Sequence, residues 1–503
     1  MAVNIFVPLV IILATCVYLY SKKKFLYWKD RNVYHMEPTF FYGNIKTVIK
    51  DHAHLTTVVQ RLYDEAKTLK KRYCGFYTFF QPHFVPVDIE LVKGILQNDF
   101  DNFLNRGRYF NEKADPLSGH LFNLEDEKWK KLRIKLTPIF TSAKMKVMFQ
   151  TLLDSTERFQ KLLERLANSE QPVDLKNAFA CFTTDVIGSI AFGLECSSME
   201  NPDSEFRKYG DEAFRKSLRQ RIGIVLTSVF PWWLVRLTGY KTFSKDMDNF
   251  FTNLVTEVIE EREKQKIERK DYLQLLINLN KSVKDKGNMQ ALTMEEIAAQ
   301  CFGFFIAGFE TSSMTMNFAV LELSQNIDVQ EKLREEIVAV LSKHNNQITF
   351  DTLNEMVYLD KVMQETLRKH PPLGILVRIC NRDYKLSNDD LILKKGTMVS
   401  IPIQAIQRDP DYYPDPEKFD PERFNKENIN QRPAFSYLPF GEGPRICIGM
   451  RLGKLQSKIG LITLLKNYRI TFNEKTKLPL TLAFATISMP KDGIWVNLDP
   501  IRN

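Results

Sequence analysis

The segment from Leu292 to Asn326 (LTMEEIAAQCFGFFIAGFETSSMTMNFAVLELSQN) constrains the fold of this chain more than any other. Thr293 and Glu296 form a capping box, in which each side chain satisfies the backbone amide of the other residue at a helix start. The apolar run behind them is long enough for a central helix that is buried on most of its sides. Such a helix must be surrounded by other elements, so the segment predicts a large helical unit.

The rest of the sequence agrees with a mainly α fold that has a minor β portion. Apolar residues recur every three or four positions in segments such as Ala143–Asn168, which predicts a helix there. Two short strand-like runs, GTMVSIPI and GIWVNL, lie near the C-terminus. The 503 residues contain no internal repeat and no linker rich in proline, serine or glycine, so we expect one large folded unit.

Charge and cysteine usage exclude several classes of function. The net charge of +9 implies a basic face for an acidic partner or a membrane, and no nucleic-acid-binding motif accompanies it. The seven cysteines form no C-x-x-C pair, which argues against zinc ribbons and redox dithiols. Their odd number and scattered positions are typical of a reducing compartment.

The N-terminus has the pattern of a membrane anchor. Residues Val3 to Tyr20 carry no charge, are just numerous enough to span a bilayer, and are followed by Lys22-Lys23-Lys24. The alternative is a cleaved signal peptide, but a basic start and a small-x-small cleavage site are missing. We expect a transmembrane signal anchor at residues 1–21, a basic linker at 22–38 and a folded domain at 39–503. The lysines should keep that domain in the cytoplasm.

A second apolar segment, Ile222–Leu237, is rich in aromatic residues and is interrupted by Pro231. It is too short to span a bilayer. Two interpretations stay open: the segment dips into the membrane surface, or it is a buried part of the core.

The predicted central helix carries a stripe of small residues. Gly303, Ala307 and Thr311 are four residues apart, so they lie on one face, which has room for a flat object. Glu310 beside Thr311 adds an acid and a hydroxyl in apolar surroundings, where an unpaired polar group is costly to bury. The pair suits a proton relay. The alternative is an ordinary helix-packing stripe with a glutamate that faces solvent.

The segment Phe440–Gly449, FGEGPRICIG, surrounds one thiol with glycines. Glycine lets the main chain approach another object closely, and Arg445, two residues before Cys447, favours the thiolate over the thiol. The pattern therefore fits a thiolate with exposed backbone amides, held against something broad and flat. The alternative is an ordinary turn with a buried structural cysteine.

Two charged constellations accompany these motifs. Glu365 and Arg368 are three residues apart on a predicted helix, and PDPEKFDPERF supplies Arg423. A carboxylate between two guanidinium groups would lock a loop, whereas the alternative is a surface ion pair of little value. Trp129 and Arg133 share a helix face that suits an anionic group with an apolar body, or they belong to an ordinary basic amphipathic helix.

The order and spacing of these motifs resemble the cytochrome P450 haem-thiolate monooxygenases, from about residue 30 to the C-terminus. FGEGPRICIGMRLGKLQ and LTPIFTSAKMKVMF are similar in particular to the insect microsomal enzymes of family six, which act on foreign compounds and some endogenous lipids. The motifs that carry the resemblance are Trp129-x3-Arg133, Ala307-Gly308-x-Glu310-Thr311, Glu365-x-x-Arg368, Pro421-Glu422-Arg423-Phe424 and Phe440-x-x-Gly443-x-Arg445-x-Cys447-x-Gly449.

The resemblance implies the cytochrome P450 fold, a triangular helical haem domain with an N-terminal membrane anchor, and haem b as the cofactor. Cys447 would be the axial ligand of the iron, and hydrogen bonds from nearby amides would tune its electron donation. Thr311 and Glu310, with Ala307 and Gly308, would guide protons toward dioxygen. Further implied haem-binding residues are Phe440, Gly443, Gly449, Arg445, Trp129, Arg133, Arg378 and Arg106. The implied structural triad is Glu365, Arg368 and Arg423, and the implied pocket residues are Phe122, Phe304, Ala307, Leu373, Gly374 and Ile375.

The implied reaction inserts one oxygen atom of O2 into a small lipophilic substrate by hydroxylation or epoxidation. Candidate substrates are xenobiotics, plant toxins, insecticides and endogenous lipids or hormones. The expected location is the endoplasmic reticulum membrane, the source of microsomes. Two alternatives are a haem-thiolate isomerase or dehydratase and a lipophile-binding haem protein without turnover. NADPH dependence and product formation distinguish them.

The electrons must come from another protein, because no flavin or nicotinamide fingerprint occurs in the sequence. We expect NADPH–cytochrome P450 reductase as the partner, with cytochrome b5 as a second candidate donor. An acidic partner would dock on a basic face in a salt-sensitive way. The residues expected to form that face are Lys128, Lys130, Lys131, Lys135, Arg451 and Lys454.

Overall fold

The structure is a computed structural model that describes residues 2–214, 217–286, 291–483 and 485–501. Its helices are α1 (Ala2–Phe25), α2 (Lys46–Lys50), α3 (Leu55–Thr68), α4 (Ile89–Lys93), α5 (Asp126–Leu136), α6 (Ser142–Asp154), α7 (Thr156–Ala167), α8 (Leu175–Phe192), α9 (Glu205–Phe214), α10 (Leu218–Val229), α11 (Trp232–Leu237), α12 (Lys245–Gln265), α13 (Tyr272–Lys286), α14 (Met294–Gln325), α15 (Ile327–Lys343), α16 (Phe350–Glu355), α17 (Val357–Lys369), α18 (Ile403–Ile406), α19 (Lys426–Gln431) and α20 (Met450–Leu465). Its strands are β1 (Tyr73–Thr78), β2 (Gln81–Pro86), β3 (Val173–Asp174), β4 (Leu376–Ile379), β5 (Tyr384–Lys385), β6 (Ile392–Leu393), β7 (Met398–Ile401), β8 (Tyr468–Phe472) and β9 (Trp495–Pro500). The expectation of a mainly α fold with a minor β portion is confirmed.

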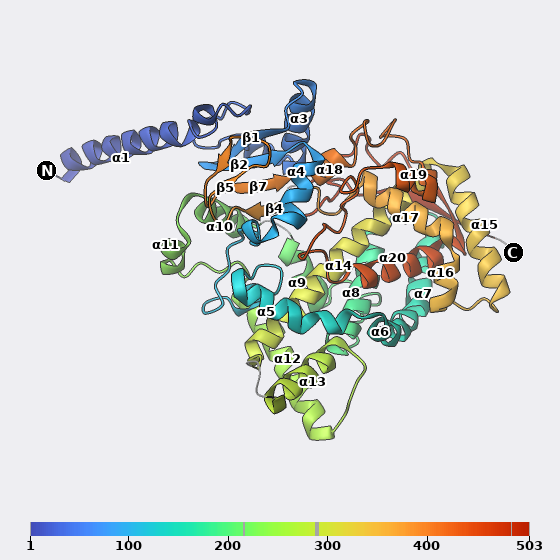
Figure 1. The fold of residues 1–503 in the computed structure, drawn as a ribbon. Helices are drawn as coiled ribbons and strands as arrows, with labels where there is room; N and C mark the ends of the chain where they lie inside the picture. Colours follow the sequence, from blue (N-terminus) through green and yellow to red (C-terminus); the bar gives the residue numbers. More distant parts are fainter. Residues whose placement is uncertain (1, 215–216, 287–290, 484, 502–503) are drawn as a thin grey trace.

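Helix α14 runs through the middle of the molecule, as its sequence predicts (Figure 1). Its capping box is present: the Thr293 hydroxyl accepts a hydrogen bond from the Glu296 amide, and the Glu296 carboxylate accepts one from the Thr293 amide. Helices α8, α12 and α20 pack against it, and its buried apolar side chains belong to the larger hydrophobic core. Burial on nearly all sides explains why its sequence is apolar with little periodicity.

Strands β1, β2, β4, β5 and β7 lie together at one side of the helical body (Figure 1). A four-stranded sheet has the order β1-β2-β7-β4, in which β2 and β7 are parallel and the other pairs antiparallel. Strands β3, β9 and β8 form a second sheet, and β5 pairs with β6. The runs GTMVSIPI and GIWVNL contain β7 and the start of β9, so both strand predictions are confirmed.

The helix predicted across Ala143–Asn168 is interrupted in the structure. Helix α6 ends at Asp154 and α7 begins at Thr156. The hydroxyl of Ser155, between them, donates to the Thr151 carbonyl at 3.4 Å. Such a bond competes with the helical backbone and favours a bend, which the apolar periodicity does not reveal.

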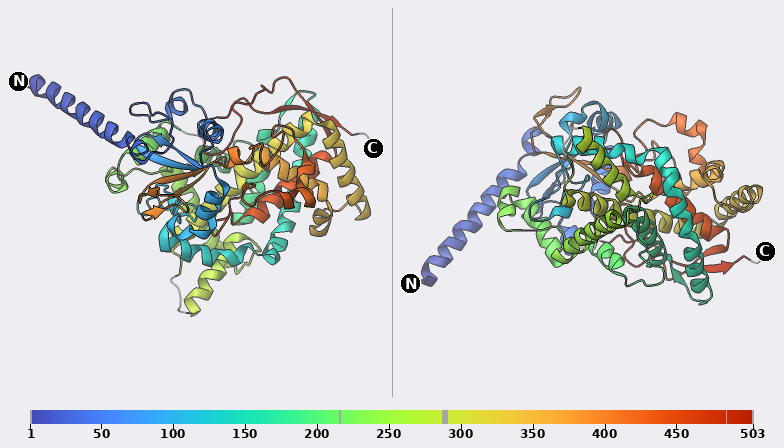
Figure 2. Two further views of the ribbon diagram at one scale, coloured as in Figure 1. Left: turned by 45° about the horizontal axis from the view of Figure 1, so that its top comes forward. Right: turned by 90° about the horizontal axis from the view of Figure 1, so that it is seen from below.

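Helix α1 extends away from the body of the protein in all views (Figures 1 and 2). Among the residues that the structure describes, we find no helix both long and apolar enough to cross a membrane. The structure therefore gives no support to the anchor expected at residues 1–21. The side chains at positions 1–7, 9, 10, 13 and 14 of that stretch lie outside those described.

The segment Ile222–Leu237 forms parts of α10 and α11, which are separated at Phe230 and Pro231. Trp233 is 65% exposed and Leu237 is 75% exposed. The interpretation of this segment as buried core is therefore wrong for these side chains. These two exposed side chains form an apolar surface on α11.

Candidate functional site

The cysteine loop, residues 440–449, leads directly into α20. The amide of Cys447 donates to the carbonyl of Phe440 at 3.0 Å, and the Cys447 sulfur accepts a hydrogen bond from the Gly449 amide. Gly443 has a φ of +77°, and a Cβ at this position would overlap the Leu96 carbonyl. Only glycine fits there, because L residues rarely adopt this φ and no space exists for a side chain.

The thiol of Cys447 is accessible although protein surrounds it. It is exposed, yet desolvation by the surrounding protein raises its pKa, while the Gly449 amide, Arg106 and Arg133 act in the opposite direction. Ala307, in the middle of the otherwise buried α14, is also exposed. Surface that is accessible but surrounded by protein is typical of a cavity wall.

The packing of α20 on α14 brings the accessible surfaces of Cys447 and Ala307 close to each other. A Cβ placed on Gly453, near the start of α20, would lie 3.7 Å from the Ser312 hydroxyl of α14. Cys447 precedes α20 by three residues, and Thr311 precedes Ser312. The cysteine loop therefore lies near the part of α14 that carries Ala307 and Thr311.

Four arginines gather around the cysteine loop: Arg106, Arg133, Arg378 and Arg445. The Arg445 guanidinium lies 4.3 Å from the centre of the Trp129 ring, and Arg106 Nη2 donates to the Arg445 carbonyl at 3.5 Å. Buried nitrogens of Arg106 (Nε), Arg378 (Nε and Nη2) and Arg445 (Nε and Nη1) have no hydrogen-bond partner among the described residues.

Burial weakens the basicity of these arginines. It lowers the pKa of Arg378 and of Arg445 to about 9, and repulsion by Arg445 and by Arg106, respectively, acts in the same direction. Unpaired buried charges are costly, so the cluster requires an anionic partner with several acceptor oxygens. The two propionates of haem meet this requirement, with the Cys447 thiol close by to ligate iron. The residues present therefore fit the cofactor implied by the sequence.

The stripe of Gly303, Ala307 and Thr311 on α14 is only partly accessible. The Thr311 hydroxyl donates to the Ala307 carbonyl at 2.6 Å, and Thr311 is partly exposed, whereas Glu310 is only 2% exposed. Thr311 and Glu310 therefore do not share one accessible surface. A Cβ on Gly303 would lie 2.7 Å from the His120 side chain.

Gly308 faces another helix. A Cβ at this position would lie 2.6 Å from Cδ1 of Ile187 on α8. The absence of a side chain therefore lets α14 and α8 pack closely. This position does not join Ala307 and Thr311 on the accessible face.

The residues predicted to line the pocket are dispersed. Phe122 lies at the arginine cluster, with its ring centre 3.8 Å from the Arg106 guanidinium. Phe304 instead stacks on Tyr272 of α13, with ring centres 4.5 Å apart, so it packs in the core between α14 and α13. Leu373 and Ile375 are half-buried, and Gly374 is buried against Thr56 and Gln404.

The triad of Glu365, Arg368 and Arg423 is assembled. Arg368 donates to both carboxylate oxygens of Glu365, at 2.7 and 2.8 Å, and Arg423 Nε lies 3.5 Å from Glu365 Oε1. Glu365 and Arg368 are completely buried, so the alternative of a surface ion pair is wrong. Arg368 also donates to the carbonyls of Gln407 and Pro416.

Gln407 connects this triad to the cysteine loop, and sequence reasoning missed it. Its Nε2 donates to the carbonyls of Leu367 and Arg368, at 3.0 and 2.9 Å. Its Oε1 accepts from the Leu438 amide at 2.7 Å, two residues before Phe440. A single glutamine between α18 and an irregular segment carries no recognisable sequence signal.

The expected basic face on α5 and α20 is partly neutralised. Lys128 pairs with Glu112 at 2.6 Å, and Lys130 lies 3.4 Å from Asp101. Lys131 is exposed, and Lys135 is half-buried. On α20, Arg451 donates to the Ser142 hydroxyl, and Lys454 lies over the Phe440 ring at 5.6 Å.

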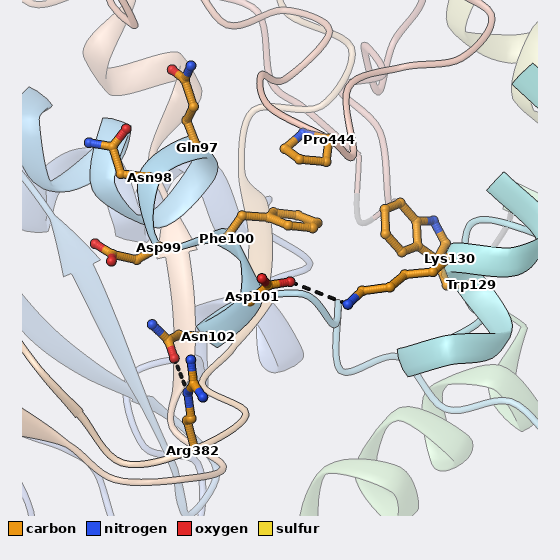
Figure 3. A pocket seen from close by; sticks show the side chains of 10 residues that line it. All are labelled: Gln97, Asn98, Asp99, Phe100, Asp101, Asn102, Trp129, Lys130, Arg382 and Pro444. Atoms are coloured by element: carbon orange, nitrogen blue, oxygen red, sulfur yellow. Dashed lines mark hydrogen bonds and ion pairs between the residues drawn. The ribbon is translucent and has the colours of Figure 1, made fainter. Parts of the chain in front are cut away.

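A surface pocket of about 490 Å³ opens beside the cysteine loop (Figure 3). One wall is formed by Trp129 and Lys130 at the start of α5, and another by Pro444. The Asp101–Lys130 ion pair crosses from the segment after α4 to α5. The remaining lining residues are Gln97, Asn98, Asp99, Phe100, Asn102 and Arg382.

Comparisons with known proteins identify similar sequences over almost the whole chain. A family model described as cytochrome P450 matches residues 36–498. A Drosophila melanogaster protein named probable cytochrome P450 6a13 is 42% identical over 500 residues, which cover 98% of this chain and 99% of that protein. Cytochrome P450 6A1 of Musca domestica is 39% identical over 497 residues, covering 98% and 97%. Cytochrome P450 6j1 of Blattella germanica is 37% identical over 490 residues, covering 97% and 96%.

Proposed function

Because the chain belongs to the cytochrome P450 family and is a monooxygenase of that family, we propose that it uses NADPH-derived electrons and O2 to hydroxylate or epoxidise lipophilic substrates. The observation that carries the proposal is the group of buried arginine nitrogens without partners beside the Cys447 thiol. The proposed substrates are xenobiotics, plant toxins, insecticides and endogenous lipids or hormones.

The chain would hold haem through side chains on several elements. Cys447 would ligate the iron, and Arg106, Arg133, Arg378 and Arg445 would bind the propionates beside Trp129. Haem, when bound, supplies the chemistry that activates dioxygen. The hydrogen bond from the Gly449 amide to the Cys447 sulfur limits the negative charge that the sulfur donates.

The accessible part of α14 would control water and protons. The Thr311 hydroxyl, bonded to the Ala307 carbonyl, holds a proton at a fixed place on this face. Glu310, one residue away and buried, would take part in the same proton relay without facing the accessible surface. A regulated proton supply matters because uncontrolled access of water and protons would divert the reaction from product to hydrogen peroxide.

The substitution Thr311→Ala should raise the peroxide formed per NADPH consumed by roughly severalfold, an effect of about 1 kcal/mol on the competition between two pathways. The reason is that the hydroxyl on the accessible face is lost. Peroxide, product and NADPH are measured in the same reaction, and the spectrum of the haem should not change. Thr315→Ala, which removes a similar hydroxyl bonded to the Thr311 carbonyl, is the matched control. Unchanged coupling in Thr311→Ala would contradict this role.

We also propose the partner and the location. NADPH–cytochrome P450 reductase, with cytochrome b5 as a second donor, would dock beside the cysteine loop, where Lys131 and Arg451 are exposed. The protein would work at the endoplasmic reticulum membrane with residues 39–503 in the cytoplasm. The exposed Trp233 and Leu237 of α11 support contact with a lipid surface.

The reaction is tested by isotope incorporation. The purified holoprotein, the reductase, NADPH and ¹⁸O2 are incubated with a panel of neutral lipophilic compounds. We expect products that carry one ¹⁸O atom and do not form without NADPH. Product formation without NADPH would favour an isomerase or dehydratase. Binding without any product would favour a lipophile carrier.

A further inference from the structure

Arg108, two residues after the cluster member Arg106, has accessible surface but lies in dehydrating surroundings. Its side chain is exposed, yet desolvation by the surrounding protein lowers its pKa. The Cys447 thiol has the same two properties. Among the described residues, no carboxylate forms an ion pair or a hydrogen bond with this guanidinium.

The neighbours of Arg108 place it near the accessible part of α14. Its guanidinium lies 5.5 Å from the centre of the Phe122 ring, whose other neighbour is Arg106. Burial lowers the pKa of His120 to about 3, and the nearby positive charges of Arg108 and Arg106 lower it further. The His120 side chain lies against Gly303 of α14. Arg108 thus belongs to the same region as the stripe Gly303–Ala307.

The haem propionates do not require Arg108. Two propionates carry two negative charges, and Arg106, Arg133, Arg378 and Arg445 already surround the cysteine loop. The orphaned buried nitrogens belong to Arg106, Arg378 and Arg445. Arg108 is a fifth cation, with an aromatic ring beside it and with no anionic partner in the part of the chain that the structure describes.

We propose that Arg108 binds the carboxylate of the substrate, so that the preferred substrates are lipophilic molecules ending in a carboxylate, such as long-chain fatty acids. This inference rests on the proposed function and narrows its substrate class. The planar guanidinium forms paired hydrogen bonds with a carboxylate, and these bonds are strong where water is excluded. Phe122 packs against the apolar chain next to the charged end.

The test compares two ligands of equal length on the haem-loaded protein. Dodecanoate and dodecan-1-ol differ in charge but have the same chain. Equilibrium dissociation constants are measured by calorimetry for the wild type, Arg108→Gln and Arg108→Lys. We expect Arg108→Gln to weaken dodecanoate binding at least about tenfold, which corresponds to about 1.4 kcal/mol, and to leave dodecan-1-ol within about twofold. Arg108→Lys should retain part of the preference because it retains the charge.

Lys113→Gln, an exposed cation on the same loop, is the matched control and should bind both ligands like the wild type. Equal dodecanoate affinity in wild type and Arg108→Gln would overturn the inference. So would equal weakening of both ligands together with faster haem loss, because Arg108 would then bind a propionate. The carbon-monoxide spectrum and ¹⁸O incorporation into neutral substrates report on the proposed function separately, so failure of one proposal is distinguishable from failure of the other.

Discussion

The substitution Cys447→Ser should abolish the strongly red-shifted Soret band of the reduced carbon-monoxide complex and lower monooxygenase turnover by roughly a thousandfold or more, about 4 kcal/mol of transition-state stabilisation. A serine hydroxyl is far less acidic than a thiol, so it cannot provide the anionic sulfur ligand that promotes O–O cleavage. The volume of the side chain hardly changes, and the loop around it is held by backbone contacts. We therefore expect the variant to remain folded.

The measurement is the difference spectrum of the purified protein at known haem content, with turnover recorded on the same sample. Cys16→Ser is the matched control, because Cys16 and Cys447 are the exposed cysteines among the seven free thiols. It should retain both the band and the turnover. A folded, haem-loaded Cys447→Ser protein with an unchanged band would show that another group ligates the iron, and the monooxygenase site would have to be placed elsewhere.

The arginine cluster links folding to the cofactor. Arg378 is completely buried and Arg445 is 3% exposed, and both have nitrogens without partners. Such groups destabilise the protein unless an anion satisfies them. A ligand that binds only the folded state stabilises it by mass action, so haem binding should contribute to the stability of the whole domain.

Local rules in the sequence predicted much of the fold and the site. The capping box of Thr293 and Glu296 depends on residues three apart, and it is present as predicted. The pairing of Glu365 with Arg368 also follows from helical spacing. Their burial does not, because it depends on segments such as Pro416 and Gln407 that are distant in the sequence.

The packing that the sequence does not reveal has the same cause. Gly308 fits the motif for a cofactor face, but the packing of Ile187 against it is a property of two helices that no local pattern contains. Phe304 is one residue from Gly303, yet its ring stacks on Tyr272, because neighbouring helix positions point about 100° apart. Arg108 stands in the segment FLNRGR close to Arg106, and only the tertiary structure shows that no carboxylate among the described residues pairs with it.

The substitution Arg368→Ala should lower the free energy of unfolding by about 3–5 kcal/mol, because it leaves the Glu365 carboxylate buried with the Asp420 amide and the more distant Arg423 as its partners. It also removes the donors to Gln407 and Pro416, and Gln407 holds the start of the cysteine loop. We therefore expect little haem-loaded protein, measured as haem per chain and as the midpoint of urea unfolding.

A matched control is the exposed pair Arg61–Glu65, in which the arginine side chain is 74% exposed. Arg61→Ala should cost less than about 1 kcal/mol, since water solvates the glutamate that remains.

Adding Glu365→Gln to Arg368→Ala should recover part of the loss, because a neutral amide is cheaper to bury than an unpaired carboxylate. If Arg368→Ala were no more destabilising than Arg61→Ala, the triad would not hold the cysteine loop. The buried pair of Glu365 and Arg368 would then not stabilise the fold. Recovery in the double variant, by contrast, would identify the uncompensated charge of Glu365 as the cause of the loss.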